Sequence, residues 1–251
     1  MQMARQSESK ATDPAVPVLI TRPRTEAEAF ATALAARFGT RLRPIVAPLI
    51  APRYLTPEVP VHPWAAVAFT SAHAVEGARR LSLPLPRQAW CVGRKTADVA
   101  RAAGFQAQSA DGTVDDLVSA ILKAPQNGRI LYLRGVDTRG NLLEKLQSSG
   151  VDTEVAIVYA QAPQPLSPQA LDLLRRDAAV IVPLFSPRTA LLFRTALPAD
   201  LRANLHIATM SAAVAETLDG LPRRALAVAR HPDAPGMLDA VESLLATLAP
   251  P

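Results

Sequence analysis

Hydroxyl side chains stand twice at the point where a buried strand would pass into a helix. The apolar run Val67–Phe69 is followed by Thr70 and Ser71, and the run Ile181–Phe185 is followed by Ser186. A hydroxyl in this position can cap the helix, and the N–H groups of a helix start can bind an anion. The sequence therefore predicts two related turns that could hold an anionic ligand.

Further polar residues follow other predicted strands. These candidates for ligand binding are Arg22, Gly93, Thr96 and Arg134. The planar guanidinium of arginine suits carboxylates and phosphates. A purely structural role stays open for each: Ser71 and Thr96 could be plain helix caps, and the arginines could pair with helix carboxylates.

Other kinds of chemistry find little support. The single cysteine, Cys91, lies in an apolar run and is interpreted as a small core residue. The four histidines are far apart, and no pair has metal-ligand spacing. No Gly-x-Ser-x-Gly elbow and no Gly-rich nucleotide loop follows a strand. We expect no metal and no cofactor.

Composition narrows the class of protein. The chain has 251 residues, of which 49% are hydrophobic and 20% charged, which is typical of a folded soluble protein. Its net charge is +5, and only four of its 27 basic residues are lysines. No basic run or zinc spacing supports nucleic-acid binding, and an anionic small molecule fits the basic charge equally well. With no apolar run of membrane length, no signal-peptide pattern and one cysteine, we expect a cytoplasmic protein without membrane contact.

Strands and helices alternate along most of the chain. We predict strands at residues 18–21, 65–69, 89–92, 105–108, 130–133, 155–159, 180–184, 205–208 and 225–229, and helices at 25–38, 72–81, 96–103, 115–123, 141–149, 171–176, 189–195, 211–218 and 236–248. Such alternation is typical of parallel α/β sheets with helices on both faces. The fold class expected is therefore α/β.

An internal repeat predicts two similar domains. Residues 91–97 resemble 207–213, and the run Leu131–Gly135 resembles Leu19–Pro23 at the other end of the chain. We expect a continuous domain at 54–158, a discontinuous one at 17–43 plus 166–251, linkers at 44–53 and 159–165, and a flexible tail at 1–16. Ligands of parallel sheets bind beyond the carboxyl ends of the strands, so a cleft between the domains is expected.

The assembled motifs resemble the uroporphyrinogen-III synthase family over about residues 17–248. The matching stretches, in order, are Thr21–Pro23, Phe69–Ser71 with Ala74-Val75, Val92-Gly93 with Thr96-Ala97, Tyr132–Gly135, Gly150 before Val155–Tyr159, Phe185–Pro187, and Val228-Ala229 with Pro235–Leu238. The family's fold is two parallel-sheet α/β domains, one of them discontinuous, joined by two linker segments.

The resemblance implies a cofactor-free activity. Linear hydroxymethylbilane, which bears eight carboxylates, is cyclised to uroporphyrinogen III with loss of water and inversion of ring D, a hydro-lyase step of tetrapyrrole biosynthesis. It also implies that Tyr159 helps the substrate hydroxyl to leave, and that Thr70, Ser71 and Thr96 hold carboxylates. Hydroxymethylbilane synthase would be a transient partner handing over the substrate, and a monomer is expected.

The second half departs from the family pattern. The glycine and threonine usual at one strand–helix turn appear as Thr209 and Ala212, and the second hydroxyl pair is reduced to Phe185-Ser186. We assign Thr209 and Ala212 no role. A non-catalytic two-domain binding protein for an anionic small molecule remains the alternative hypothesis.

Overall fold

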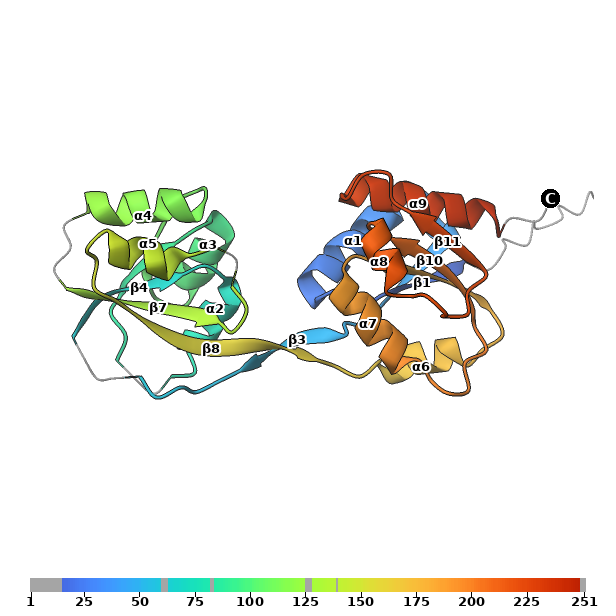
Figure 1. Cartoon of the computed structure of the whole chain (residues 1–251), viewed down its shortest axis with the longest axis horizontal. Coiled ribbons are helices and arrows are strands. Elements are labelled where there is room, and N and C mark those ends of the chain that lie inside the picture. Colours follow the sequence, from blue (N-terminus) through green and yellow to red (C-terminus); the bar gives the residue numbers. More distant parts are fainter. Residues whose placement is uncertain (1–14, 60–62, 82–83, 125–127, 139, 249–251) are drawn as a thin grey trace, which may run out of the picture. The chain divides into compact units, whose positions relative to one another are not determined.

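The chain folds into two compact units in a computed structural model that describes residues 15–59, 63–81, 84–124, 128–138 and 140–248. Unit 1 takes the described residues up to Ala51 together with those from Pro163 onward, and unit 2 runs from Pro52 to Ala162. Each unit has its own sheet and its own core (Figure 1).

Unit 1 is built on a five-stranded parallel sheet in the order β11-β10-β9-β1-β2. Its elements are β1 Val16–Ile20, α1 Arg24–Phe38, the 3₁₀ turn Gly39–Arg41, β2 Leu42–Val46, α6 Pro168–Leu174, β9 Ala179–Leu184, α7 Pro187–Ala196, β10 Asn204–Thr209, α8 Ala212–Glu216, β11 Ala225–Val228 and α9 Ala234–Ala246.

Helices cover both faces of the unit 1 sheet. One core cluster joins Leu19, Val182 and Ile207 of the strands to residues of α6, α7 and α8. The other joins Val18 and Ile181 to residues of α1 and α9. Neighbouring residues along a strand point to opposite faces, so continuous apolar strands can serve two cores at once.

Unit 2 is built on a six-stranded sheet in the order β3-β8-β7-β4-β5-β6. Its elements are β3 Ile50–Tyr54, β4 Trp64–Phe69, α2 Ala72–Ala78, β5 Gln88–Cys91, α3 Arg94–Ala102, β6 Gln106–Ser109, α4 Val114–Lys123, β7 Arg129–Gly135, α5 Leu142–Ser148 and β8 Thr153–Pro163. The first two residues of β3 and the last residue of β8 fall in unit 1. Helices α2 and α3 pack on one face, and α4 and α5 on the other.

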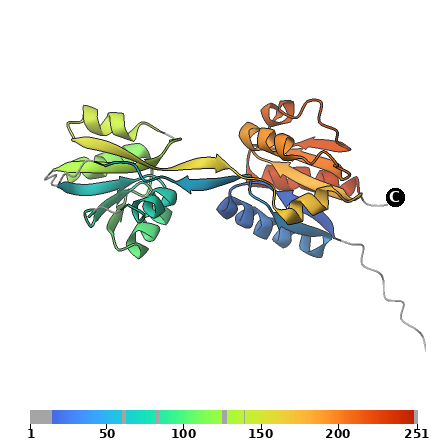
Figure 2. The same cartoon turned by 90° about the horizontal axis from the view of Figure 1, so that it is seen from below.

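Strand β3 is the antiparallel member of the second sheet. The N–H of Leu55 donates to the carbonyl of Val158, and the N–H of Gln164 donates to that of Leu49. The partner residue number falls as the other rises, so β3 and β8 run in opposite directions, as Figure 2 also shows. The other pairings of this sheet are parallel.

Both sheets have the same strand order when equivalent strands are matched. Strands β9, β10, β11, β1 and β2 of unit 1 correspond to β4, β5, β6, β7 and β8 of unit 2. This order reproduces the repeat expected from the sequence, including the N-terminal segment that completes the C-terminal sheet. In each sheet the winding reverses at one point, between β9 and β1 or between β4 and β7, and such switch points are where open α/β sheets bind ligands.

The segments expected as linkers contain strand residues, and the last residue of the expected tail belongs to β1. Residues 44–46 of the first linker belong to β2 and residues 50–53 to β3, while residues 159–163 of the second belong to β8. The prolines that suggested linkers are tolerated because β2 and β3 are edge strands, where a missing N–H breaks no ladder. Val16 starts β1, and residues 1–14 of the expected tail lie outside the described residues.

Among the helices of the described ranges, none has the length and apolar character needed to cross a membrane.

Cys91 is a core residue of unit 2. It ends β5, is 0% exposed and packs in the cluster that includes Phe69 and Ala97. Burial raises the pKa of its thiol from 9.0 to about 11, against the opposing effect of Arg101. The thiolate that nucleophilic chemistry requires is therefore disfavoured in the folded protein.

We predict that the buried thiol of Cys91 makes the free energy of unfolding fall as the pH rises into the alkaline range. The unfolded thiol ionises from about pH 9 and the folded one only near 11, so the unfolded state holds fewer protons in this window and stability falls as the pH rises. Chemical denaturation of the wild type and Cys91→Ala across this range should show a steeper loss for the wild type. Parallel curves, or rapid iodoacetamide labelling of the folded protein at pH 8, would contradict this assignment.

Candidate functional site

Six of the predicted site residues gather at one edge of unit 2. Strands β7, β4 and β5 end side by side, and they or the turns after them carry Arg134, Thr70 with Ser71, and Gly93. Tyr159 lies within β8, opposite the last residue of β7. Thr96 follows in the first turn of α3. The other two candidates, Arg22 and Ser186, lie at the corresponding edge of unit 1.

Tyr159 is held in place by a glycine. It pairs with Gly135 of β7 where the register shifts, and the N–H of Val136 donates to its carbonyl at 2.9 Å. A Cβ added at Gly135 would lie 2.6 Å from Cζ of Tyr159 and 2.9 Å from its hydroxyl. The phenol thus occupies the space that a side chain at position 135 would fill.

The surroundings of Tyr159 leave its hydroxyl available. Its ring lies 5.6 Å from the ring of His73 in α2, with the planes tilted by 57°. The residue is 7% exposed, and its hydroxyl makes no hydrogen bond to any described residue. A phenol so placed can donate to a ligand atom without first breaking an internal bond.

A second tyrosine joins β7 to β4 at the switch point. The hydroxyl of Tyr132 lies 3.1 Å from Oγ1 of Thr70, and Tyr132 itself is 3% exposed. Burial raises the pKa of Tyr132, against the opposing effects of the Thr70 hydrogen bond and of Arg134. This hydrogen bond fixes the orientation of the Thr70 side chain. The sequence showed only that a hydroxyl follows the strand.

The two helix starts at this edge differ. Ser71 caps α2, because its Oγ accepts from the N–H of His73 at 3.2 Å, so the plain-cap role left open for it is present. Its hydroxyl proton can still be donated to an anion. At α3 the N-cap is Gly93, no described side chain caps the helix, and a Cβ on Gly93 would meet nothing within 4 Å.

The first turn of α3 is basic. Arg94 and Lys95 occupy it with no acidic residue, although cations oppose the positive end of a helix dipole. Arg94 pairs with Asp111 at 2.9 Å, whereas Lys95 is exposed and has no ion pair to a described residue. An uncapped helix start with an unpaired lysine suits an anion. Thr96 is not the cap, as was one possibility, but a buried residue whose N–H donates to the Gly93 carbonyl.

Arg134 turns back on its own strand end. Its Nη1 donates to the carbonyls of Gly135 and Val136, both at 3.2 Å. The guanidinium therefore supports the bulge beside Tyr159, and it forms no ion pair with a helix carboxylate among the described residues.

In unit 1 the switch point holds an arginine on an aromatic ring. The guanidinium of Arg22 lies 3.9 Å from the ring centroid of Phe185, which also contacts Phe30 edge-on at 5.0 Å. Burial lowers the pKa of Arg22, and Glu26 opposes this. Stacking on Phe185 orders the guanidinium before any ligand binds.

Ser186 caps α7. Its Oγ accepts from the N–H of Thr189 at 3.3 Å and lies 2.8 Å from the Thr189 hydroxyl. Thr209 is 0% exposed, and Ala212 opens α8, a helix of five residues. The hydroxyls of Thr21 and Thr209 are buried and find no partner among the described residues. A side chain as buried as Thr209 gives a dissolved ligand no access.

Sequence reasoning missed four residues of these edges: Tyr132, Gly135, His73 and Lys95. Tyr132 and Gly135 were visible only as parts of a strand motif, and their roles depend on the cross-strand register. Lys95 had a signal, because a cation in the first turn of a predicted helix is unfavourable without an anion nearby. In the described ranges no group of three His, Cys, Asp or Glu residues could hold a metal ion.

Comparison with solved structures supports the fold. Uroporphyrinogen-III synthetase from Helicobacter pylori is 18% identical, with 92% of this chain and 99% of that one covered at a TM-score of 0.53. A mutant synthase from Thermus thermophilus is 20% identical, with 93% of this chain and 100% of that one covered, at a TM-score of 0.41. No curated protein matches the chain.

A sequence model described as uroporphyrinogen-III synthase HemD matches residues 28–239. The matched range contains most of both sheets and seven of the eight predicted site residues, all but Arg22. The chain therefore belongs to the uroporphyrinogen-III synthase family, and at the level of the family its function is that of a uroporphyrinogen-III synthase.

Proposed function

We propose that the chain is a carbon–oxygen lyase that converts hydroxymethylbilane into uroporphyrinogen III, a step of tetrapyrrole biosynthesis. Family membership supports the activity, and the edge of unit 2 supports the chemistry. The observation that carries the proposal is Tyr159, a phenol held against Gly135 with its hydroxyl free to donate.

The proposed role of Tyr159 is to assist departure of the substrate hydroxyl. A hydrogen bond from the phenol to that oxygen helps the C–O bond to break, and the oxygen leaves as water once protonated. The cation left on the bilane is then attacked by the substituted carbon of ring D. A spiro intermediate and its rearrangement give the inverted ring. Holding the bilane folded favours this attack over simple end-to-end closure.

The carboxylates of the substrate are proposed to bind at helix starts. In unit 2 the uncapped start of α3 with Lys95 is the strongest anion site, and Thr70 and Ser71 add hydroxyl donors. In unit 1 the ordered guanidinium of Arg22 is proposed to bind a further carboxylate, with Ser186 beside α7. Gly93 contributes by letting the ligand approach the backbone.

We further propose that the enzyme is cytoplasmic and monomeric and that it receives its substrate from hydroxymethylbilane synthase. The reduced, buried Cys91 is compatible with a reducing compartment.

The direct test supplies hydroxymethylbilane to the purified protein and separates the uroporphyrinogen isomers by chromatography. We expect isomer III to exceed isomer I and to rise with enzyme concentration. Isomer I alone at every enzyme concentration would contradict the synthase and leave a non-catalytic binding protein.

We predict that Tyr159→Phe lowers turnover at least about tenfold, because a positioned proton donor is lost. Folding should change little, since the hydroxyl has no internal partner among the described residues. Tyr54→Phe is the matched control: Tyr54 lies on β3 with Arg80 over its ring at 4.1 Å, and a phenylalanine keeps that contact. Equal activity of the Tyr159 and Tyr54 variants would argue against the assignment.

We predict that Gly135→Ala mimics Tyr159→Phe in turnover. The new Cβ would overlap the tip of the Tyr159 ring, which must turn aside, whereas the backbone at 135 is not in the left-handed region. Turnover should fall about tenfold, and thermal stability should stay near that of the wild type because a side-chain tip can move. Wild-type turnover in this variant would show that the position of the ring is unimportant.

We predict that Lys95→Gln raises KM for hydroxymethylbilane about three- to tenfold with a smaller change in kcat, because one charge-assisted contact is worth about 1 kcal/mol. The effect should shrink at high salt. Lys123→Gln, at the far end of α4, is the control with the same charge change. If both variants behave alike, net charge and not a specific contact explains the result.

A further inference from the structure

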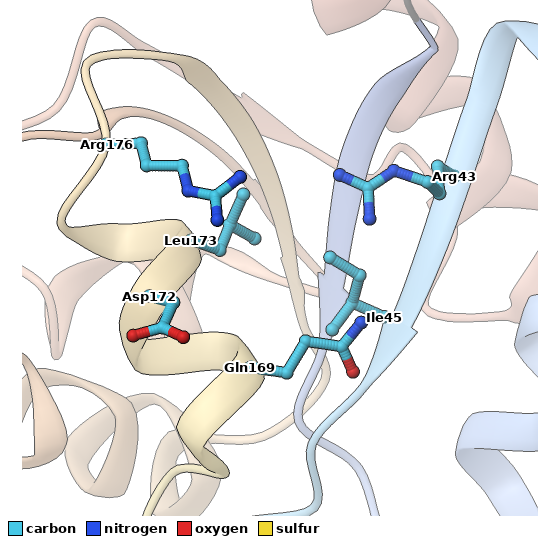
Figure 3. Close-up of a pocket in the computed structure, with 6 residues that line it drawn as sticks. All are labelled: Arg43, Ile45, Gln169, Asp172, Leu173 and Arg176. Carbon is cyan, nitrogen blue, oxygen red and sulfur yellow. The ribbon is translucent and has the colours of Figure 1, made fainter.

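Unit 1 contains a pocket that the proposed reaction does not use. It lies between the edge strand β2 and helix α6, has a volume of about 320 Å³, and is lined by Arg43, Ile45, Gln169, Asp172, Leu173 and Arg176 (Figure 3). This volume is at the lower end of the range for small-molecule sites.

The pocket follows from how α6 meets the sheet edge. Arg43 and Ile45 are two residues apart on β2 and so point to the same face, and Ile45 belongs to the core under α6. On the other side, Gln169 and Leu173 lie one turn apart on α6, and Arg176 follows two residues after the helix ends at Leu174. Ile45 and Leu173, which are 3% and 6% exposed, make an apolar floor.

Two arginines converge above this floor. Figure 3 shows the guanidinium groups of Arg43 and Arg176 reaching toward one another from opposite sides, with the amide of Gln169 below them. Neither arginine forms an ion pair with a described residue. Asp172 also lines the pocket, from α6, and it forms no ion pair with either arginine.

Arg175, the neighbour of Arg176, has a carboxylate partner within the protein. Nε of Arg175 lies 3.1 Å from the carboxylate of Asp200, so that charge is neutralised inside the protein. Arg43 and Arg176 instead face each other, and two like charges in one pocket repel unless an anion lies between them. Their planar forks suit an oxyanion with two or more oxygens.

The pocket is separate from the candidate site of the same unit. Arg43 lies level with Pro17 in the β1–β2 register, whereas Arg22 follows the end of β1. Five residues of extended chain separate these levels, which is about 16 Å along the strand. A ligand in the pocket therefore makes no contact with the switch point of unit 1.

We propose that this pocket binds a small organic oxyanion: a carboxylate or phosphate ester whose anionic group bridges Arg43 and Arg176 and whose compact apolar body rests on Ile45 and Leu173. Gln169 donates one further hydrogen bond through its amide. The site is independent of the synthase reaction and does not require that the protein be a synthase.

The test is a titration of the full-length, isotope-labelled protein followed by NMR, with benzoate, phenyl phosphate and neutral benzamide as probes. We expect saturable shifts at residues 43–45 and 169–176 with benzoate or phenyl phosphate, and none with benzamide. The anion that binds with the higher affinity shows whether the site prefers a carboxylate or a phosphate ester. Absence of saturation with both anions would overturn the proposal.

Matched variants distinguish the site from general charge effects. Arg43→Gln and Arg176→Gln should each weaken binding of the preferred anion at least tenfold, while Arg175→Gln, with the same charge change one residue away, should stay within twofold of the wild type. Equal weakening by Arg175→Gln would overturn the proposal. All three side chains are exposed, so the variants should fold, and amide spectra of the free proteins verify this.

Discussion

The contact between Gly135 and Tyr159 is the constraint on which the chemistry of unit 2 depends. A side chain at position 135 would meet the phenol at 2.6 Å, so the ring lies where it does only because residue 135 is glycine. The register shift at this point brings Gly135 opposite Tyr159, and Arg134 stabilises the shifted backbone through two carbonyls. The result is a phenol held by backbone and packing rather than by a hydrogen bond of its own.

The two units use the same strand order for different contacts. At the switch point of unit 2, the hydroxyl groups of Thr70 and Tyr132 form a hydrogen bond, so the polar side chains at this edge are ordered. At the equivalent place in unit 1, Phe185 stands where the repeat has Thr70, and it carries the guanidinium of Arg22. One unit thus offers hydroxyls and an uncapped helix start, and the other a single ordered cation. A repeated fold has supplied two non-equivalent edges.

Periodicity predicted the fold well because strands buried on both faces leave continuous apolar runs, and several helices are followed by a recognisable glycine such as Gly104 or Gly150. The edge strands were harder. Pro44 and Pro52 suggested linkers, since sequence does not reveal which strand has an unpaired side. The pairing of β1 with β9 could be inferred only through the repeat, and the structure shows it directly.

The site was predictable to the extent that it depends on local sequence. Ser71 and Ser186 were recognisable as helix caps, and both are. Thr96 was misjudged as a possible cap because the helix begins two residues earlier, at Arg94. Gly135, His73 and Tyr132 depend on contacts across strands or between a strand and a helix, and a single sequence carries no direct record of these.

The central claim is that Gly135 acts on the reaction through Tyr159 alone. Its most direct test is the turnover of the double variant Gly135→Ala/Tyr159→Phe, compared with both single variants in the isomer-resolved assay. If the glycine serves only to position the phenol, the double variant should turn over as slowly as Tyr159→Phe and no slower, because effects through one group are not additive. Turnover reduced by the product of the two single effects would contradict the account.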